Sequence, residues 1–136
     1  MEQKDYLLRE IEKIGVVLRA ILNRLTGSKG NFATTVESVF EKTDEELVHK
    51  INFDLTCFLA LDESASLDYI SRFEGMSSIN LELLAEIIYQ IAIQGSARQK
   101  RILLEKAIFL YEFCETTDKT FSFVREQRIK EIKKAL

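Results

Sequence analysis

The chain contains no proline in 136 residues, so the residue that most strongly interrupts helices is absent throughout. Proline breaks a helix because it lacks an amide hydrogen and its ring clashes with the preceding turn. Apolar residues recur at helical spacing along most of the chain, and no segment alternates apolar and polar residues between turn signals. The sequence therefore predicts an all-α fold, and its length predicts a single domain over residues 1–136.

The N-terminal segment has the clearest helical pattern, which predicts a helix over residues 3–25. Its apolar residues are spaced alternately four and three positions apart, a pattern typical of helices that pack side by side. We call this set the N-terminal seam, and it consists of Leu7, Ile11, Ile14, Leu18, Ile21 and Leu25. The seam predicts either packing inside the domain or an interface with a second copy of the chain.

Six further helices are expected from capping signals and apolar faces, about seven in all. Ser or Thr followed three residues later by Glu or Gln satisfies free amides at a helix start, and this spacing begins at Thr34, Thr43 and Ser96. Glycines mark expected helix ends, with Gly27 expected in a left-handed conformation. The expected ranges are 35–42, 44–61, 66–73, 80–94, 97–115 and 122–135. Because the links are short, we expect antiparallel helical hairpins.

The hairpin expected over residues 80–115 carries large and small residues at characteristic spacings. They are Leu81, Leu84, Ala85 and Ile88 in the first helix, then Ala107, Tyr111 and Cys114 in the second. With these positions the hairpin resembles a tetratricopeptide repeat with longer helices. The resemblance implies an α-α superhelix or bundle whose concave surface binds peptides. The positions that would face such a groove are Glu82, Glu86, Tyr89 and Gln90.

The two ends of the chain carry a second set of recognisable segments. The C-terminal set comprises an aromatic-Ser-Phe link, a basic last helix over residues 128–134, and the helix positions Ala107, Leu110, Tyr111 and Glu112. The N-terminal set covers residues 5–9 and 11–12. Both sets are similar to the ends of a small, uncharacterised bacterial family of helical proteins. This resemblance supports the helical fold and implies no activity, cofactor or catalytic residue.

The charge and cysteine content restrict the partners and the compartment. A net charge of −3 lacks the basic field of most nucleic-acid binders, so we expect no nucleic-acid partner. We expect no membrane association either, because the N-terminus lacks a signal peptide and the early apolar stretch is short. Cys57 and Cys114 have neither disulfide-framework nor zinc-site spacing, so we expect buried, reduced thiols in a cytoplasmic protein.

A basic tail near the C-terminus is open to two interpretations. It comprises Arg125, Arg128, Lys130, Lys133 and Lys134, interrupted by two glutamates. Such a tail can contact RNA or anionic lipid, or it can be a solvated helix face near a helix C-terminus, where cations are stabilising. We favour the solvated face.

No motif indicates catalysis, so we expect no catalytic residue, no cofactor, no metal site and no enzymatic activity. His49, the only histidine, is expected on the solvent side of its helix, and residues 43–46 are interpreted as a helix cap, not a metal cluster. An enzymatic or small-ligand-binding bundle would require polar side chains converging inside the core. The candidates are Asn23, Asn52 and Asp54 with Tyr89.

These patterns predict a non-enzymatic helical scaffold that binds a protein or peptide partner. The first alternative is a structural homo-oligomer, such as a homodimer, assembled through the N-terminal helix. The second is a small ligand-binding or enzymatic helical bundle.

Overall fold

The computed structural model describes residues 2–27, 36–94, 97–118 and 122–136. Within these residues the chain forms helices and no strand, which confirms the predicted all-α fold. The helices are α1 (Glu2–Gly27), α2 (Val36–Ile51), α3 (Leu55–Ala60), α4 (Glu63–Ser71), α5 (Ser78–Gln94), α6 (Ala97–Asp118) and α7 (Phe123–Ala135). None of the described helices is both long and apolar enough to cross a membrane.

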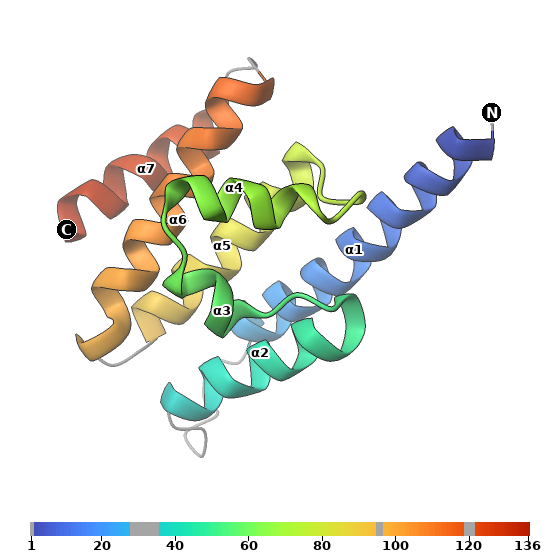
Figure 1. The fold of residues 1–136 in the computed structure, drawn as a ribbon. Helices are drawn as coiled ribbons and strands as arrows, with labels where there is room; N and C mark the ends of the chain where they lie inside the picture. The colour runs from blue at the N-terminus through green and yellow to red at the C-terminus, as the bar shows by residue number, and fades with distance from the viewer. Residues whose placement is uncertain (1, 28–35, 95–96, 119–121) are drawn as a thin grey trace.

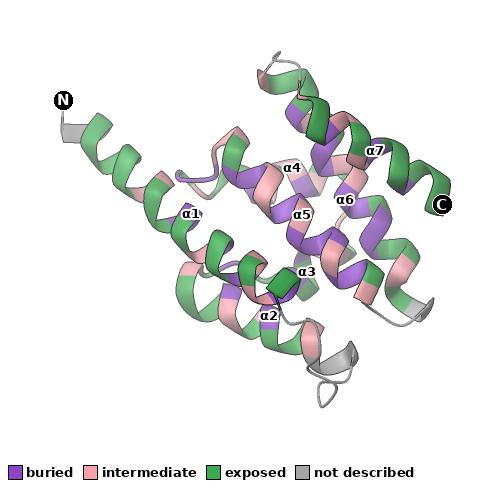
Figure 2. Ribbon diagram, turned by 180° about the vertical axis from the view of Figure 1, so that it is seen from behind, coloured by how far each residue is buried: buried purple, intermediate pink, exposed green. Residues whose placement is uncertain are grey.

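Helix α5 is the centre of the molecule and lies between α1 and α6 (Figure 1). Its apolar residues nearly encircle it, a pattern typical of a buried helix. The structure confirms this burial, because Leu84, Ile87 and Ile88 are fully enclosed. Figure 2 shows buried residues on α5 and on the faces of α1 and α6 that pack against it. Helix α7 packs on α6 at the outer edge of this layer.

The division of residues 36–61 into helices differs from the prediction. We expected a break at Thr43, but α2 continues through this residue, which is buried and accepts a hydrogen bond from Arg24. The break comes at Asn52, whose φ of 59° is left-handed and cannot continue a right-handed helix. Asp54 then caps α3, since its carboxylate accepts the amide of Cys57 at 2.9 Å. The acidic residue Asp44 also accepts the amide of Leu55.

Helices α3 and α4 cover one face of the α5–α6 pair (Figure 1) and are attached to it by a buried lysine. Lys106 of α6 donates to the carbonyl of Leu61 at 2.8 Å and to the hydroxyl of Ser66 at 2.6 Å. Its ammonium also lies 4.7 Å from the ring centre of Phe58, a favourable cation–π position. The lysine therefore joins α6 to the junction between α3 and α4.

Two glycines occupy very different surroundings. Gly75 lies in the link between α4 and α5, where an added Cβ would lie 2.5 Å from the carbonyl oxygen of Glu10. The side chain of Asn80 joins α1 to this link, because it donates hydrogen bonds to the carbonyls of Ile11 at 2.9 Å and Gly75 at 2.7 Å. Gly27 instead belongs to α1, where an added Cβ would meet no other part of the chain within 4 Å, and it does not have the left-handed φ that we expected.

Candidate functional site

The four predicted groove residues lie on the side of α5 against which α7 is held. Their contacts come mainly from α7: Arg125 binds Glu82, Arg128 binds Glu86, and Tyr89 lies against Arg128. Gln90 donates to Glu86 along the same helix at 3.0 Å. We call Glu82 and Glu86 of α5, together with Asp118 of α6, the acidic face. The structure thus brings the predicted residues together and places a helix of the same chain across them.

Glu86 is the centre of the first half of this contact. Arg128 donates to both of its carboxylate oxygens, with Nε 2.9 Å from Oε1 and Nη2 2.7 Å from Oε2. Tyr111 of α6 donates its hydroxyl to Oε1 at 2.5 Å. The carboxylate therefore links α5, α6 and α7 through charge-assisted hydrogen bonds, which are among the strongest in proteins.

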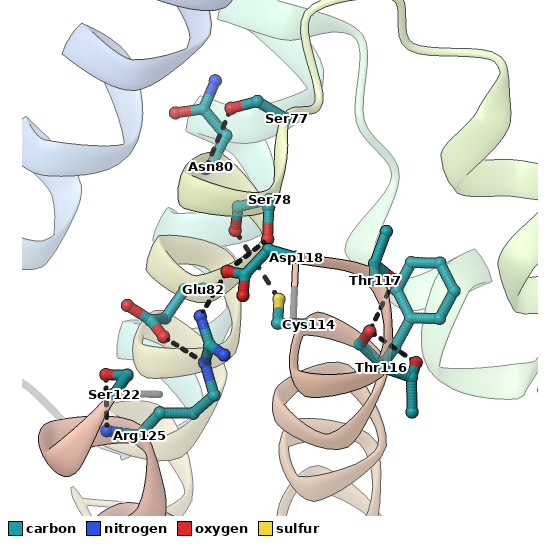
Figure 3. Close-up of polar contacts among 11 residues, drawn as sticks. Ser77, Ser78, Asn80, Glu82, Cys114, Thr116, Thr117, Asp118, Ser122 and Arg125 are labelled. Carbon is teal, nitrogen blue, oxygen red and sulfur yellow. Dashed lines mark hydrogen bonds and ion pairs between the residues drawn. The ribbon is translucent and has the colours of Figure 1, made fainter. Parts of the chain in front are cut away.

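Arg125 forms the second half of the contact, one turn earlier on α7 (Figure 3). Its Nε donates to Glu82 at 2.6 Å and its Nη2 to Asp118 at 2.8 Å. Ser78 at the start of α5 also donates to Asp118, at 3.2 Å. The side chain of Arg125 is only 5% exposed, and its Nη1 has no hydrogen-bond partner among the described residues. Two carboxylates thus compensate one buried guanidinium.

Tyr89 extends the contact between the two helices. The guanidinium carbon of Arg128 lies 4.1 Å from the centre of the Tyr89 ring, a cation–π geometry. Both residues also bind Glu131 of α7: Arg128 donates to it at 2.6 Å and Tyr89 at 3.3 Å. The Tyr89 ring therefore lies against the same Arg128 guanidinium that is paired with Glu86.

The electrostatics of this cluster favour charged arginines and neutral tyrosines. Burial opposes the charge on Arg128, but hydrogen bonds and the negative charge of Glu86 outweigh it and raise the arginine pKa above its usual value. Asp118 and Glu82 act in the same way on the pKa of Arg125. Burial, followed by the charge of Glu86, raises the pKa of Tyr111. At neutral pH the two arginines of the cluster are therefore charged and its two tyrosines are neutral.

The basic tail divides into an inward and an outward part. Arg125 and Arg128 point to the acidic face, whereas Lys130, Lys133 and Lys134 are exposed as a solvated face would require. The apolar residues Phe123, Val124 and Leu136 are also exposed. The buried residues of α7 are Arg125, Ile129 and Ile132. Paired arginines followed by paired isoleucines, at helical spacing, mark the buried side of α7 in the sequence, but they do not identify the surface that it contacts.

The N-terminal seam is divided between the core and the surface. Ile14, Leu18, Ile21 and Leu25 are buried in the core, Ile11 is half-buried, and Leu7 is 40% exposed. The first turns of α1 project beyond the rest of the molecule (Figure 1). This projecting end carries Tyr6 and Leu8, which are 52% and 55% exposed. Most of the seam therefore packs within the chain, and its first residue does not.

A cleft of about 710 Å³ opens between the projecting half of α1, the end of α2 and the link before α5. Its lining includes Tyr6, Tyr69, Asn52 and the exposed His49. It is broad and open, and its charged residues carry both signs, such as Lys13 and Glu74.

The side chains proposed for an enzymatic core do not converge. Asn23 is exposed on α1, Asp54 caps α3, and Tyr89 takes part in the contact with α7. Asn52 lines the cleft beside α1 instead. Among the residues described, no group of three or more His, Cys, Asp or Glu side chains is placed to hold a metal ion.

The two cysteines differ, although we expected both to be buried. Cys57 is exposed on the short helix α3, because the long helix we expected there is broken at Asn52. Cys114 is buried, and burial raises the pKa of its thiol to about 11. A raised pKa suppresses the thiolate, the reactive form of cysteine.

The resemblances to the tetratricopeptide repeat and to the bacterial family stay predictions. No protein-family model, no curated protein and no solved structure matches this chain.

Proposed function

We propose that this chain is a non-enzymatic helical scaffold that binds a protein or peptide partner on the acidic face of its tetratricopeptide-like α5–α6 hairpin. The observation that carries the proposal is the seating of α7 on Glu82, Glu86 and Asp118 through two arginines. Helix α7 buries Ile129 and Ile132 and pairs its arginines with carboxylates of the hairpin, as an amphipathic helix does in helix-in-groove recognition. The same carboxylates and the ring of Tyr89 offer this chemistry to a partner.

The composition of the contact favours recognition over a purely structural role. Only Arg125, Ile129 and Ile132 of α7 are buried, whereas the core helix α5 buries many more of its residues. Ion pairs near a surface are weakened by salt and give more specificity than stability. A partner that supplies the same charges can therefore compete with α7 for the acidic face.

A selection from a random peptide library, displayed on phage and screened against the full chain, tests this proposal. We expect enriched peptides whose binding weakens about tenfold or more against Glu82→Gln/Glu86→Gln, because charged hydrogen bonds contribute about 1.5–3 kcal/mol each. Glu112→Gln/Glu115→Gln, two exposed α6 positions, is the matched control and should bind like the wild type. A library without enrichment, or peptides indifferent to Glu82 and Glu86, would contradict the proposal.

The second candidate function is a structural homo-oligomer assembled through the N-terminal helix. It is supported by the projecting end of α1, where Tyr6, Leu7 and Leu8 are exposed on consecutive positions. Light scattering over a concentration series separates the two candidates. A dimer mass that reverts to monomer in Leu7→Glu supports self-assembly, and a monomer mass at every concentration rejects it.

A further inference from the structure

We infer that α7 occupies the acidic face as an intramolecular stand-in, and that the partner is an amphipathic helix bearing two arginines three positions apart with apolar residues after the second. This inference rests on the proposed function and specifies its ligand. The pattern is read from α7 itself, where Arg125 and Arg128 bind carboxylates and Ile129 and Ile132 are buried.

The spacing of the charges defines the register of the bound helix. Glu82 and Glu86 are four positions apart on α5, so their carboxylates are about one turn apart on the same side of that helix. Arg125 and Arg128 are three positions apart on α7, which also places them on one side. Each arginine meets one glutamate, so a partner with a different spacing would match only one of the two.

The geometry selects arginine over lysine. Arg128 uses two nitrogens on the two oxygens of Glu86 and a third on Glu131, while its plane lies over Tyr89. Arg125 reaches two separate carboxylates, Glu82 and Asp118, from one guanidinium. A lysine ammonium can donate to two acceptors, but it has no planar fork that binds both oxygens of one carboxylate, so it cannot reproduce the Arg128 arrangement.

The apolar part of the contact is small, and this makes α7 replaceable. Ile129 and Ile132 are buried, but Phe123 and Val124 remain 65% and 72% exposed on the same helix. A partner helix with the same arginines and isoleucines would make the same contacts, and apolar residues at further positions would bury surface that α7 leaves exposed. The covalent attachment of α7 opposes this exchange, since a tethered helix competes at an effective concentration of about millimolar.

Fluorescence anisotropy with a labelled peptide of residues 122–136 tests the inference on the full-length chain. In the wild type, the attached α7 competes with the peptide. In Arg125→Ala/Arg128→Ala the attached helix lacks its ion pairs, and we expect the peptide to bind about tenfold tighter or more than to the wild type. Lys130→Ala/Lys133→Ala removes the same charge from the exposed side and should bind like the wild type.

If the double arginine variant does not fold, a second variant and a second peptide still test the inference. Ile132→Ala weakens the attached helix while leaving the acidic face unchanged, and it should also bind the peptide more tightly than the wild type. A peptide with both arginines replaced by lysine should bind either variant at least about tenfold more weakly than the native peptide.

Each result separates the inference from the function on which it rests. Equal binding of arginine and lysine peptides, or no gain over the wild type in either folded variant, overturns the inference. If library selection still yields peptides that depend on Glu82 and Glu86, the scaffold function stands and only the arginine-helix ligand is rejected. If that selection also fails, both are rejected.

Discussion

Arg128 and Glu86 are 42 positions apart in the chain and form a bidentate ion pair between α7 and α5. The side chains of Arg128 and Glu86 are 23% and 18% exposed, so water screens the pair only in part. Because Glu86 also accepts from Tyr111 of α6, the loss of this one arginine weakens a junction of three helices.

We predict that Arg128→Lys lowers the free energy of unfolding by about 1–2 kcal/mol. A lysine keeps the positive charge but lacks the two parallel N–H donors that bind both oxygens of Glu86. Arg101→Lys is the control, since its ion pair with Glu105 is largely exposed and should contribute less than about 0.5 kcal/mol. Urea unfolding followed by circular dichroism measures both. Equal effects of the two substitutions would show that the bidentate geometry contributes nothing.

The N-terminal seam gives a second prediction, which separates its buried and exposed parts. Leu18 is fully buried, so Leu18→Glu should destabilise the chain by more than about 4 kcal/mol through an unpaired charge in the core. Leu7→Glu should change stability by less than about 0.5 kcal/mol, since its side chain reaches solvent. Thermal melts test this directly, and a folded Leu18→Glu chain would refute the assigned packing of α1.

The glycines provide a matched pair of substitutions for the third prediction. Gly75→Ala should destabilise the chain by about 1–3 kcal/mol, because the new methyl group collides with the backbone of Glu10 and forces α1 away from the link. Gly27→Ala meets no atom within 4 Å and should be neutral or stabilising by up to about 1 kcal/mol. Denaturation midpoints compare the two. A neutral Gly75→Ala would mean that this link does not touch α1 closely in solution.

The buried thiol of Cys114 predicts a loss of stability at alkaline pH. Its folded-state pKa of about 11 is above the ordinary value of 9.0, so the unfolded chain releases its thiol proton first. The stabilising contribution is therefore complete below about pH 9 and is lost as the pH rises to about 11, at about 1.4 kcal/mol for each unit of pKa difference. Cys114→Ala should flatten this decline, measured as the free energy of unfolding against pH.

The exposed thiol serves as the control for the pH experiment. Cys57 is outside the core, so Cys57→Ala should keep the alkaline decline of the wild type. If Cys114→Ala and the wild type lose stability in parallel between pH 9 and 11, another group is responsible.

Local patterns predicted most of the fold because helices are encoded by neighbouring residues. The apolar circumference of α5 predicted its burial, and the regular spacing from Ile14 to Leu25 predicted the packed part of α1. The break between α2 and α3 was missed, because a capping-box spacing at Thr43 occurs equally well inside a helix. The left-handed turn at Asn52 has only a weak preference in sequence.

The candidate site was predictable only on the α5 side. Helical spacing grouped Glu82, Glu86, Tyr89 and Gln90 on one face, but it contains no information about what covers that face. What covers this face is decided by the pairing of its glutamates with Arg125 and Arg128, more than 40 positions away. Such pairing is a tertiary property that the periodicity of one sequence does not carry.

Lys106 has a consequence for the order in which the chain assembles. Its bonds to Leu61 and Ser66 span 45 and 40 positions, so the α3–α4 cover gains this attachment only after α6 is in place. We expect the cover to be a late and separable cooperative unit, whose amides exchange with solvent through partial openings of lower free energy than those of α5. Native-state hydrogen exchange should show this ranking, and Lys106→Met should enlarge the gap. Identical opening energies for α3, α4 and α5 would instead make the described helices one folding unit.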